Sequence, residues 1–213
     1  MKTVFLVRHG KSTDNGQRIF QGLDSNLSDT GIKQAELIAD RLSSVKFDLL
    51  VSSDLPRALQ TAEIIGKKAG HQVIQNALFR EVLRPSSSNG KSWDDKAASR
   101  AWEQWDEHFF NPDIRIEDGD NYTSILDRVD ASFDFLLQRP EDTIVVVSHG
   151  LFIRSLVARV LLANDISPSG MRHFQRVISI ENTGITILHY RTAFNEEAVW
   201  RLFSLNDHAH FTN

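Results

Sequence analysis

Two strand-like runs that each end in His-Gly constrain this chain more than any other feature. The first, TVFLVRHG, spans residues 3–10, and the second, TIVVVSHG, spans residues 143–150. Each run is continuously apolar and rich in β-branched residues, which is typical of a parallel strand buried on both faces of its sheet. The two runs therefore predict that Arg8, His9 and His149 lie at the carboxyl ends of buried strands.

The rest of the chain alternates helical and strand patterns with short connections. The spacing of apolar residues predicts helices, in chain order, at 32–42, 56–69, 97–110, 122–140 and 151–163. Further strands are predicted within 47–55 and 71–79. This alternation predicts an α/β fold, a three-layer α/β/α sandwich with a mainly parallel central sheet. Ligands of such folds bind in the crevice at the carboxyl ends of the strands.

Capping residues, prolines and glycines predict where the helices begin and end. Thr30 is the expected cap of the first helix, and the second helix has Pro56 in its first turn and Gly70 after its end. Residues 176–190 are interpreted as a hairpin around Asn182–Gly184, and residues 198–206 as an added edge strand.

The middle third of the chain is mostly loop-like in sequence. Residues 82–125 consist of loop-like sequence around one predicted helix, and we expect them to form a helical and loop insertion, a lid, within a single domain of residues 1–213. Trp93, Trp102 and Trp105 are interpreted as lid core rather than as a platform for a ligand.

Composition excludes several kinds of site. The chain has no cysteine, which excludes a disulfide framework, a thiolate nucleophile and a zinc site with thiolate ligands. A formal net charge of -4 argues against nucleic acid as a partner. No apolar run is long enough to cross a bilayer and no signal-peptide pattern is found, so we expect a cytoplasmic protein with no membrane partner. The sequence leaves a monomer and a homodimer open.

The residue types at the strand ends suit phosphate chemistry. If His9 and His149 face each other with Arg8 and Arg57 beside them, the guanidinium groups can bind phosphate oxygens in pairs. Fixed positive charges disfavour protonation of a neighbouring imidazole, which keeps it neutral, as a nucleophile must be. Such an imidazole can attack phosphorus and form a phosphohistidine that water later cleaves.

The departing alkoxide needs a proton, and Glu81 is the candidate donor. It lies where the chain turns from the sheet into the predicted lid. A carboxyl group that is shielded from water beside bound phosphate favours its protonated form, as a general acid requires. Two alternatives stay open: Glu81 is a solvated carboxylate paired with Arg80 or Arg84, or the acid is Glu117 or Asp118.

Five segments, taken in order, resemble the motifs of the histidine phosphatase superfamily, the phosphoglycerate-mutase-like group. They are LVRHGKSTDN (6–15), GLDSNLSDTGIKQA (22–35), SSDLPRALQTA (52–62), VVVSHGLFIR (145–154) and ENTGIT (181–186). The resemblance covers most of residues 1–80 and 120–190.

The resemblance implies a role for each matching residue. His9 would be the phosphorylated nucleophile and Glu81 the proton donor, while Arg8, Arg57 and His149 would bind the phosphoryl group and stabilise the charge of the transition state. Asn15 would contact phosphate, and Gln21 and Gly22 would belong to the loop on the substrate side. None of these roles needs a metal, and no cofactor is expected.

The implied activity is that of a metal-independent hydrolase of the histidine acid phosphatase type, acting on a small phosphorylated molecule. Two alternatives stay open: a phosphoglycerate-type mutase, and a non-catalytic module that binds a phospho-ligand. The glycine-rich, tyrosine-bearing segment that follows the acid in true mutases is absent after Glu81, so we expect little mutase activity. Lys11 replaces the acidic residue common after Arg-His-Gly; Lys11 and Arg84 are interpreted either as exposed charges or as substrate contacts.

Overall fold

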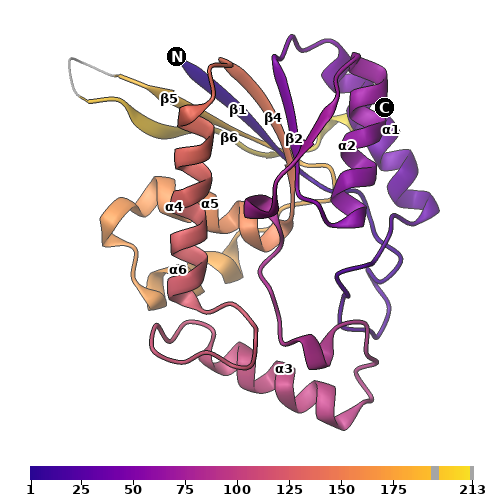
Figure 1. Cartoon of the computed structure of the whole chain (residues 1–213), viewed down its shortest axis with the longest axis vertical. Helices are drawn as coiled ribbons and strands as arrows, with labels where there is room; N and C mark the ends of the chain where they lie inside the picture. The colour runs from indigo at the N-terminus through magenta and orange to yellow at the C-terminus, as the bar shows by residue number, and fades with distance from the viewer. Residues whose placement is uncertain (193–196, 212–213) are drawn as a thin grey trace.

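A six-stranded sheet forms the centre of the protein in the computed structural model, which describes residues 1–192 and 197–211 (Figure 1). The order across the sheet is β3-β2-β4-β1-β5-β6. β1, β2, β3 and β4 run parallel, whereas β5 and β6 are antiparallel to their neighbours. The strand bounds are β1 Lys2–Arg8, β2 Leu49–Ser52, β3 Val73–Gln75, β4 Thr143–Ser148, β5 Ile185–Arg191 and β6 Val199–Asp207.

Helices cover both faces of the sheet, so the predicted three-layer α/β fold is confirmed (Figure 1). α1 and α2 pack on one face, and α4 and α5 on the other. The helix bounds are α1 Asp29–Ser43, α2 Pro56–Ala69, α3 Lys96–His108, α4 Tyr122–Gln138, α5 Gly150–Leu162 and α6 Pro168–Val177. Short 3-10 turns form η1 Ala77–Phe79, η2 Ser86–Ser88, η3 Ala163–Asp165 and η4 Ala209–Phe211. Among the described residues, no helix is both long and apolar enough to span a membrane.

Side chains alternate along β1, so each face of this strand presents its own apolar residues to the helices. Val4 and Leu6 pack with α4 and α5, whereas Val7 packs with α1 and α2, and all three are fully buried. Burying apolar area on both faces of a central strand stabilises the sheet by about 25 cal/mol per Å². The strand sequences are continuously apolar because both faces of each strand are buried.

The cap residues agree with the prediction at α2 and differ at α1. Gly70 follows α2 in the left-handed conformation, with φ of 76°. The N-cap of α1 is Ser28 rather than Thr30, because the Ser28 hydroxyl accepts the amide of Gly31 at 3.1 Å. The predicted third strand is short: β3 has three residues, and η1 follows it.

The prediction of a hairpin around Asn182–Gly184 is wrong. Arg176 and Val177 lie in α6, and residues 178–184 connect this helix to β5. β5 pairs antiparallel with β1 and with β6, the predicted edge strand. The Asn-Thr-Gly signal marks a helix-to-strand turn, in which the non-glycine residue Thr183 has a φ of 58° and donates its amide to Arg8 O.

Residues 80–121 connect η1 to α4 and include η2 and α3. Figure 1 shows α3 at the opposite end of the molecule from the β5–β6 hairpin, beyond the carboxyl ends of the parallel strands. Trp105 of α3 is 4% exposed and donates its indole N–H to Asp120 O at 2.8 Å, so it belongs to the core. That this segment works as a lid stays a prediction.

Candidate active site

The register of the sheet places the two predicted histidines beside each other. Arg8 at the end of β1 is the pairing partner of Ser148 at the end of β4, and the amide of His9 donates to Ser148 O at 2.9 Å. The imidazole rings of His9 and His149 lie with centroids 4.9 Å apart and planes inclined by 59°. Both side chains are almost fully buried.

The hydrogen bonds of His9 define which ring nitrogen is free to react. Nδ1 lies 2.6 Å from Gly10 O, and a carbonyl only accepts, so Nδ1 carries the proton. Nε2 accepts a hydrogen bond from Nε of Arg57 at 3.3 Å, and so presents a lone pair to a guanidinium group. That is the geometry of a neutral imidazole with its nucleophilic nitrogen turned toward an anion-binding cation.

Burial is the main reason why His9 is neutral. Burial, and after it the positive charges of Arg57 and Arg8, hold the pKa of His9 well below its usual value, although the bond to Gly10 O acts in the opposite direction. Burial likewise lowers the pKa of His149, with Arg57 the next cause. Both rings are therefore bases and hydrogen-bond partners rather than cations at neutral pH.

One ring nitrogen of His149 has a hydrogen-bond partner, and the other has none among the described residues. Its Nε2 lies 2.9 Å from the hydroxyl of Ser53, which already accepts the amide of Leu55 at 3.2 Å. When the Ser53 hydroxyl donates its proton to Nε2, the ring proton lies on Nδ1. This Nδ1 is buried and has no hydrogen-bond partner in the described part of the chain. A buried, unpaired donor beside two arginines is suited to an oxyanion.

Two arginines surround the imidazoles. Arg57 is 2% exposed, and its Nη1 donates to Gly22 O at 3.1 Å. Burial is the largest cause that lowers the pKa of Arg57, to about 10, so this guanidinium stays charged at neutral pH. Arg8 donates Nη1 to Ile180 O, and its buried Nε has no partner among the residues described. Gly22, predicted as a substrate residue, instead holds Arg57 through its main chain.

Two glycines of the motifs are required by close backbone contacts. A Cβ atom on Gly10 would lie 2.4 Å from Gly31 O, and one on Gly31 would lie 2.0 Å from Lys11 O. The loop after His9 can therefore approach the start of α1 only where neither residue has a side chain. Lys11 itself is exposed and is not among the residues that line the cavity over the site.

A cavity of about 480 Å³ opens over this cluster. Its walls carry Asn15 and Gln21 together with one carboxylate and four guanidinium groups, and the charged residues are Glu81, Arg8, Arg84, Arg154 and Arg176. His9, Arg57 and His149 are not among its lining residues, because they are buried beneath it. Asn15 and Gln21 both bond to Ser12, through Asn15 Oδ1 and Gln21 Nε2. The structure thus brings the predicted site residues together; Gly22 does not line this cavity but contacts the cluster through its bond to Arg57.

Glu81 caps the helix that begins after His149. Its Oε1 accepts the amides of Val82 at 2.9 Å and Phe152 at 3.0 Å, and its Oε2 accepts the amide of Leu151 at 3.3 Å. A carboxylate is favourable at a helix N-terminus. The alternative pairing with Arg80 is wrong, because Arg80 makes a two-point ion pair with Asp54 at 2.7 and 2.5 Å.

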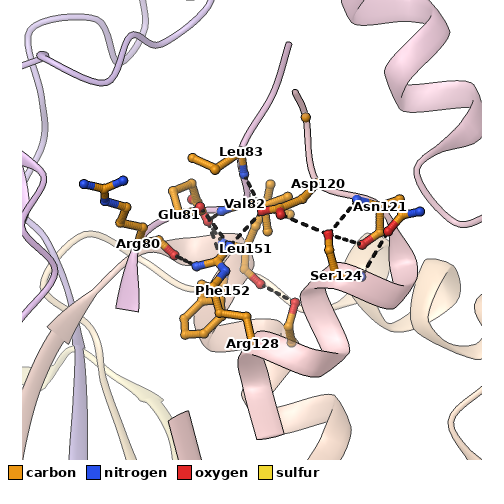
Figure 2. Close-up of polar contacts among 12 residues, drawn as sticks. Arg80, Glu81, Val82, Leu83, Asp120, Asn121, Ser124, Arg128, Leu151 and Phe152 are labelled. Atoms are coloured by element: carbon orange, nitrogen blue, oxygen red, sulfur yellow. Dashed lines mark hydrogen bonds and ion pairs between the residues drawn. The ribbon is translucent and has the colours of Figure 1, made fainter. Parts of the chain in front are cut away.

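Arg128 of α4 holds the backbone around Glu81, as Figure 2 shows. Its guanidinium donates to Leu78 O at 3.3 Å, to Arg80 O at 2.5 Å and to Glu81 O at 3.1 Å. The same group forms an ion pair with Asp120 at 2.8 Å. Asp120 in turn exchanges hydrogen bonds with the main chain of Leu83, at 2.8 Å in each direction. Arg128 therefore joins the segment that carries Glu81 to the end of the connection that precedes α4.

Sequence reasoning missed Arg128, Ser53 and Asn182, none of which carries chemistry in its own right. Asn182 donates Nδ2 to His9 O at 2.8 Å and so fixes the backbone of the nucleophile candidate. Its place in the ENTGIT segment was a signal that pointed to it. Within residues 1–192 and 197–211, no group of three His, Asp or Glu side chains is arranged to hold a metal ion.

A family profile matches most of this chain. The profile of the histidine phosphatase superfamily (branch 1) matches residues 4–203. The chain belongs to the histidine phosphatase superfamily. The match spans both His-Gly strand ends, the segment with Arg57 and the turn with Asn182, so the resemblance drawn from the sequence is confirmed.

Relatives within the superfamily include a named mutase and named phosphatases. The probable phosphoglycerate mutase GpmB of Yersinia pestis is 30% identical over 215 residues, which cover 99% of this chain and 95% of that protein. The solved structure of a mycobacterial glucosyl-3-phosphoglycerate phosphatase is 25% identical, with a TM-score of 0.73 over 97% of this chain and 99% of that one. A phosphoserine phosphatase variant from Entamoeba histolytica, solved with phosphoserine, is 25% identical, with a TM-score of 0.73 over 99% of both chains.

Superfamily membership and these relatives support an enzyme that acts on phosphate esters. The fold brings His9 and His149 together in one site, although they are distant in sequence.

Replacing Arg128 with Met is expected to destabilise the protein by about 3–5 kcal/mol, because the buried carboxylate of Asp120 loses its ion pair and the carbonyl groups of residues 78, 80 and 81 lose the guanidinium donor. The measurement is the free energy of unfolding in urea. The double replacement of Arg128 by Met and Asp120 by Leu should recover part of the loss, since it removes the unpaired charge. A single replacement that costs less than about 1 kcal/mol would contradict this view of the network.

The two neutral imidazoles should make the protein less stable in acid. Each histidine of the unfolded chain takes up a proton as the pH falls through about 6.5, whereas burial and nearby arginines keep the pKa of His9 and His149 well lower in the folded state. The unfolded state then binds more protons, so the free energy of unfolding falls below that pH by up to about 1.4 kcal/mol per pH unit for each histidine.

This expectation can be measured by urea unfolding in phosphate-free buffer between about pH 7 and pH 5. A His149→Gln variant, which has one such imidazole fewer, should show a shallower dependence of the free energy of unfolding on pH. Identical slopes for the variant and the parent protein would mean that His149 is not kept neutral by the fold.

Proposed function

We propose that this protein is a phosphomonoesterase that hydrolyses a small phosphorylated molecule through a phosphohistidine on His9. One observation carries the proposal: the unprotonated Nε2 of a neutral, buried His9 accepts its hydrogen bond from the guanidinium of Arg57. A nucleophilic nitrogen therefore faces a group that binds phosphoryl oxygen.

In the first step, the phosphoryl oxygens bind the guanidinium groups of Arg8 and Arg57 and the Nδ1 proton of His149. Nε of Arg57 exchanges His9 Nε2 for a phosphoryl oxygen, which frees the lone pair of His9. This lone pair forms an N–P bond while the bond between phosphorus and the leaving oxygen breaks. Three fixed donors stabilise the charge that the transferring group carries.

Glu81 supplies the proton that the leaving oxygen takes up. It lines the same cavity as Arg8, so its carboxyl group faces an ester that is bound there. In the second step, the Glu81 carboxylate accepts a proton from water, the water oxygen bonds to phosphorus, and the N–P bond breaks. His9 then returns to its neutral form and Glu81 to its acid form.

A phosphoglycerate-type mutase is the second candidate, favoured by the 30% identical relative that carries that name. In a mutase, the phosphoryl group passes from His9 to a second hydroxyl rather than to water. Four arginines in the cavity would also bind a second anionic group. The missing glycine-rich segment after Glu81 favours hydrolysis instead.

The test is the release of phosphate from 4-nitrophenyl phosphate in the presence of a chelator, run beside an assay for conversion of 3-phosphoglycerate to 2-phosphoglycerate. Metal-independent hydrolysis with little conversion supports the esterase. Rapid conversion with little hydrolysis supports the mutase instead. Phosphate binding without either reaction would mean that the protein is a phospho-ligand binding module.

A further inference from the structure

A second cavity adjoins the anion-binding one. Its volume is about 650 Å³, and it lies between residues 14–21 and α3. Asn15, Gln21 and Arg84 line both cavities, so the two are neighbours across these three side chains. A molecule whose phosphate lies over His9 can therefore extend into this second space.

Aromatic side chains form the wall of the second cavity. Phe20 stacks on Trp102 with ring centroids 5.8 Å apart, and it lies 6.3 Å from the ring of Trp93. Trp93 is 49% exposed, which is a large apolar area for one side chain to leave in water. The three tryptophans of residues 82–121 thus have different surroundings: Trp105 belongs to the core, whereas Trp93 and Trp102 line a cavity.

The aromatic wall is held in place by backbone hydrogen bonds. An antiparallel bridge joins Ile19 to Ser92. The amide of Phe20 donates to Lys91 O at 2.8 Å, and the amide of Trp93 donates to Arg18 O at 2.9 Å. These bonds tie the loop after His9 to the segment before α3, so the rings are already arranged before a ligand binds.

The charges around the second cavity favour a neutral occupant. Asp14 and Glu103 line it, and both would repel a second phosphate or carboxylate. Arg18 also lines it, but its guanidinium is paired with Asp94 at 3.0 Å. Arg84 makes no hydrogen bond or ion pair with the described residues, and its buried Nε lacks a partner between the two cavities. It can bind a polar atom that links the phosphate to the apolar part of a substrate.

We propose that this second cavity binds the leaving group of the substrate, and that the substrate class is phosphate esters of planar, apolar alcohols. This inference rests on the proposed esterase function and adds the specificity to it. A planar ring packs against Trp93, over whose ring the Arg18 guanidinium lies at 5.9 Å, and reaches Phe20 and Trp102, while its phosphate lies over His9.

The test compares 1-naphthyl phosphate with glycerol 2-phosphate, which has no ring. Trp93→Ala is expected to raise KM for 1-naphthyl phosphate roughly 10-fold, in line with the loss of one stacking contact, and to change KM for glycerol 2-phosphate less than about twofold. Trp93→Phe, which keeps a ring, should restore most of the affinity. Phe203→Ala is the matched control, because it removes an exposed aromatic ring from β6. Trp93 is exposed, so its replacement spares the core.

Binding without turnover separates this inference from the proposed function. We expect 1-naphthylmethylphosphonate to bind the wild-type protein at least about 10-fold more tightly than methylphosphonate, and Trp93→Ala to remove that difference. If no ester is hydrolysed but this preference is found, the esterase proposal fails and the aromatic site stands. If esters are hydrolysed and Trp93→Ala affects both substrates equally or neither, the aromatic site is overturned.

Discussion

Replacement of His9 by Gln is expected to lower kcat for phosphate ester hydrolysis by about 10⁴-fold or more, because it removes the proposed attacking nitrogen. Nε2 of His9 accepts a hydrogen bond from Arg57, whereas Nε2 of the nearby His149 bonds to Ser53. Glutamine retains polar atoms in the buried space but is not a nucleophile toward phosphorus.

The matched control is His149→Gln. This residue is equally buried in the same cluster, but it contributes a hydrogen-bond donor rather than the attacking atom, so the expected loss is smaller, about 10²–10³-fold. Urea unfolding midpoints of both variants should be measured to show that each one folds. A His9→Gln variant that keeps more than about 1% of the parent activity, or that is more active than His149→Gln, would contradict the assignment of the nucleophile.

Replacement of Glu81 by Gln is expected to slow the hydrolysis of esters with poor leaving groups much more than that of esters with good leaving groups. Gln keeps one carbonyl oxygen, which can accept the amide of Phe152 as Glu81 Oε1 does, but its amide group has no acidic proton to give. Hydrolysis of an alkyl phosphate, whose alkoxide leaves poorly, should slow by about 10²–10³-fold. Hydrolysis of 4-nitrophenyl phosphate should slow less than about fivefold, since its leaving group needs no proton.

Glu117→Gln and Asp118→Asn are the controls for this experiment. Both carboxylates lie outside the cavity that Arg8 and Glu81 line, and they bond to Ser87 and Ser86 instead. Their replacement should leave both rates within about twofold of the parent values. Equal slowing of the alkyl and aryl esters by Glu81→Gln would show that Glu81 is not the acid.

The strand ends could be predicted from the sequence because each depends on a short, local pattern. A continuous apolar run followed by a charged or polar residue marks where a parallel strand meets the ligand crevice, and Arg8, His9 and His149 follow such runs. Arg57 was found in the same way, beside a strand end and a helix start marked by Pro56. The structure adds the register, Arg8 beside Ser148, which sets the spacing of the two rings.

The contacts that hold the site in place could not be predicted because they join distant segments. Asn182 bonds to His9 O and Arg128 to Glu81 O. The ENTGIT segment marks Asn182 as a residue of interest but not its partner, and no local pattern marks Arg128. α6 was missed for a different reason: Ser167 and Pro168 form a standard helix start, but the helix is short and polar. The bond of Gly22 to Arg57 could not be predicted, because it is made by a main-chain carbonyl that any residue type would present.

The central claim is that Nε2 of His9 attacks phosphorus, and the most direct measurement is a search for the phosphorylated protein during turnover. The enzyme is mixed with a rapidly leaving ester, quenched in alkali, where phosphohistidine survives, and digested for mass spectrometry. We predict one phosphoryl group on the peptide that contains His9, and none in the His9→Gln variant. Steady hydrolysis with no phosphorylated peptide, or with the phosphoryl group on His149, would contradict the account.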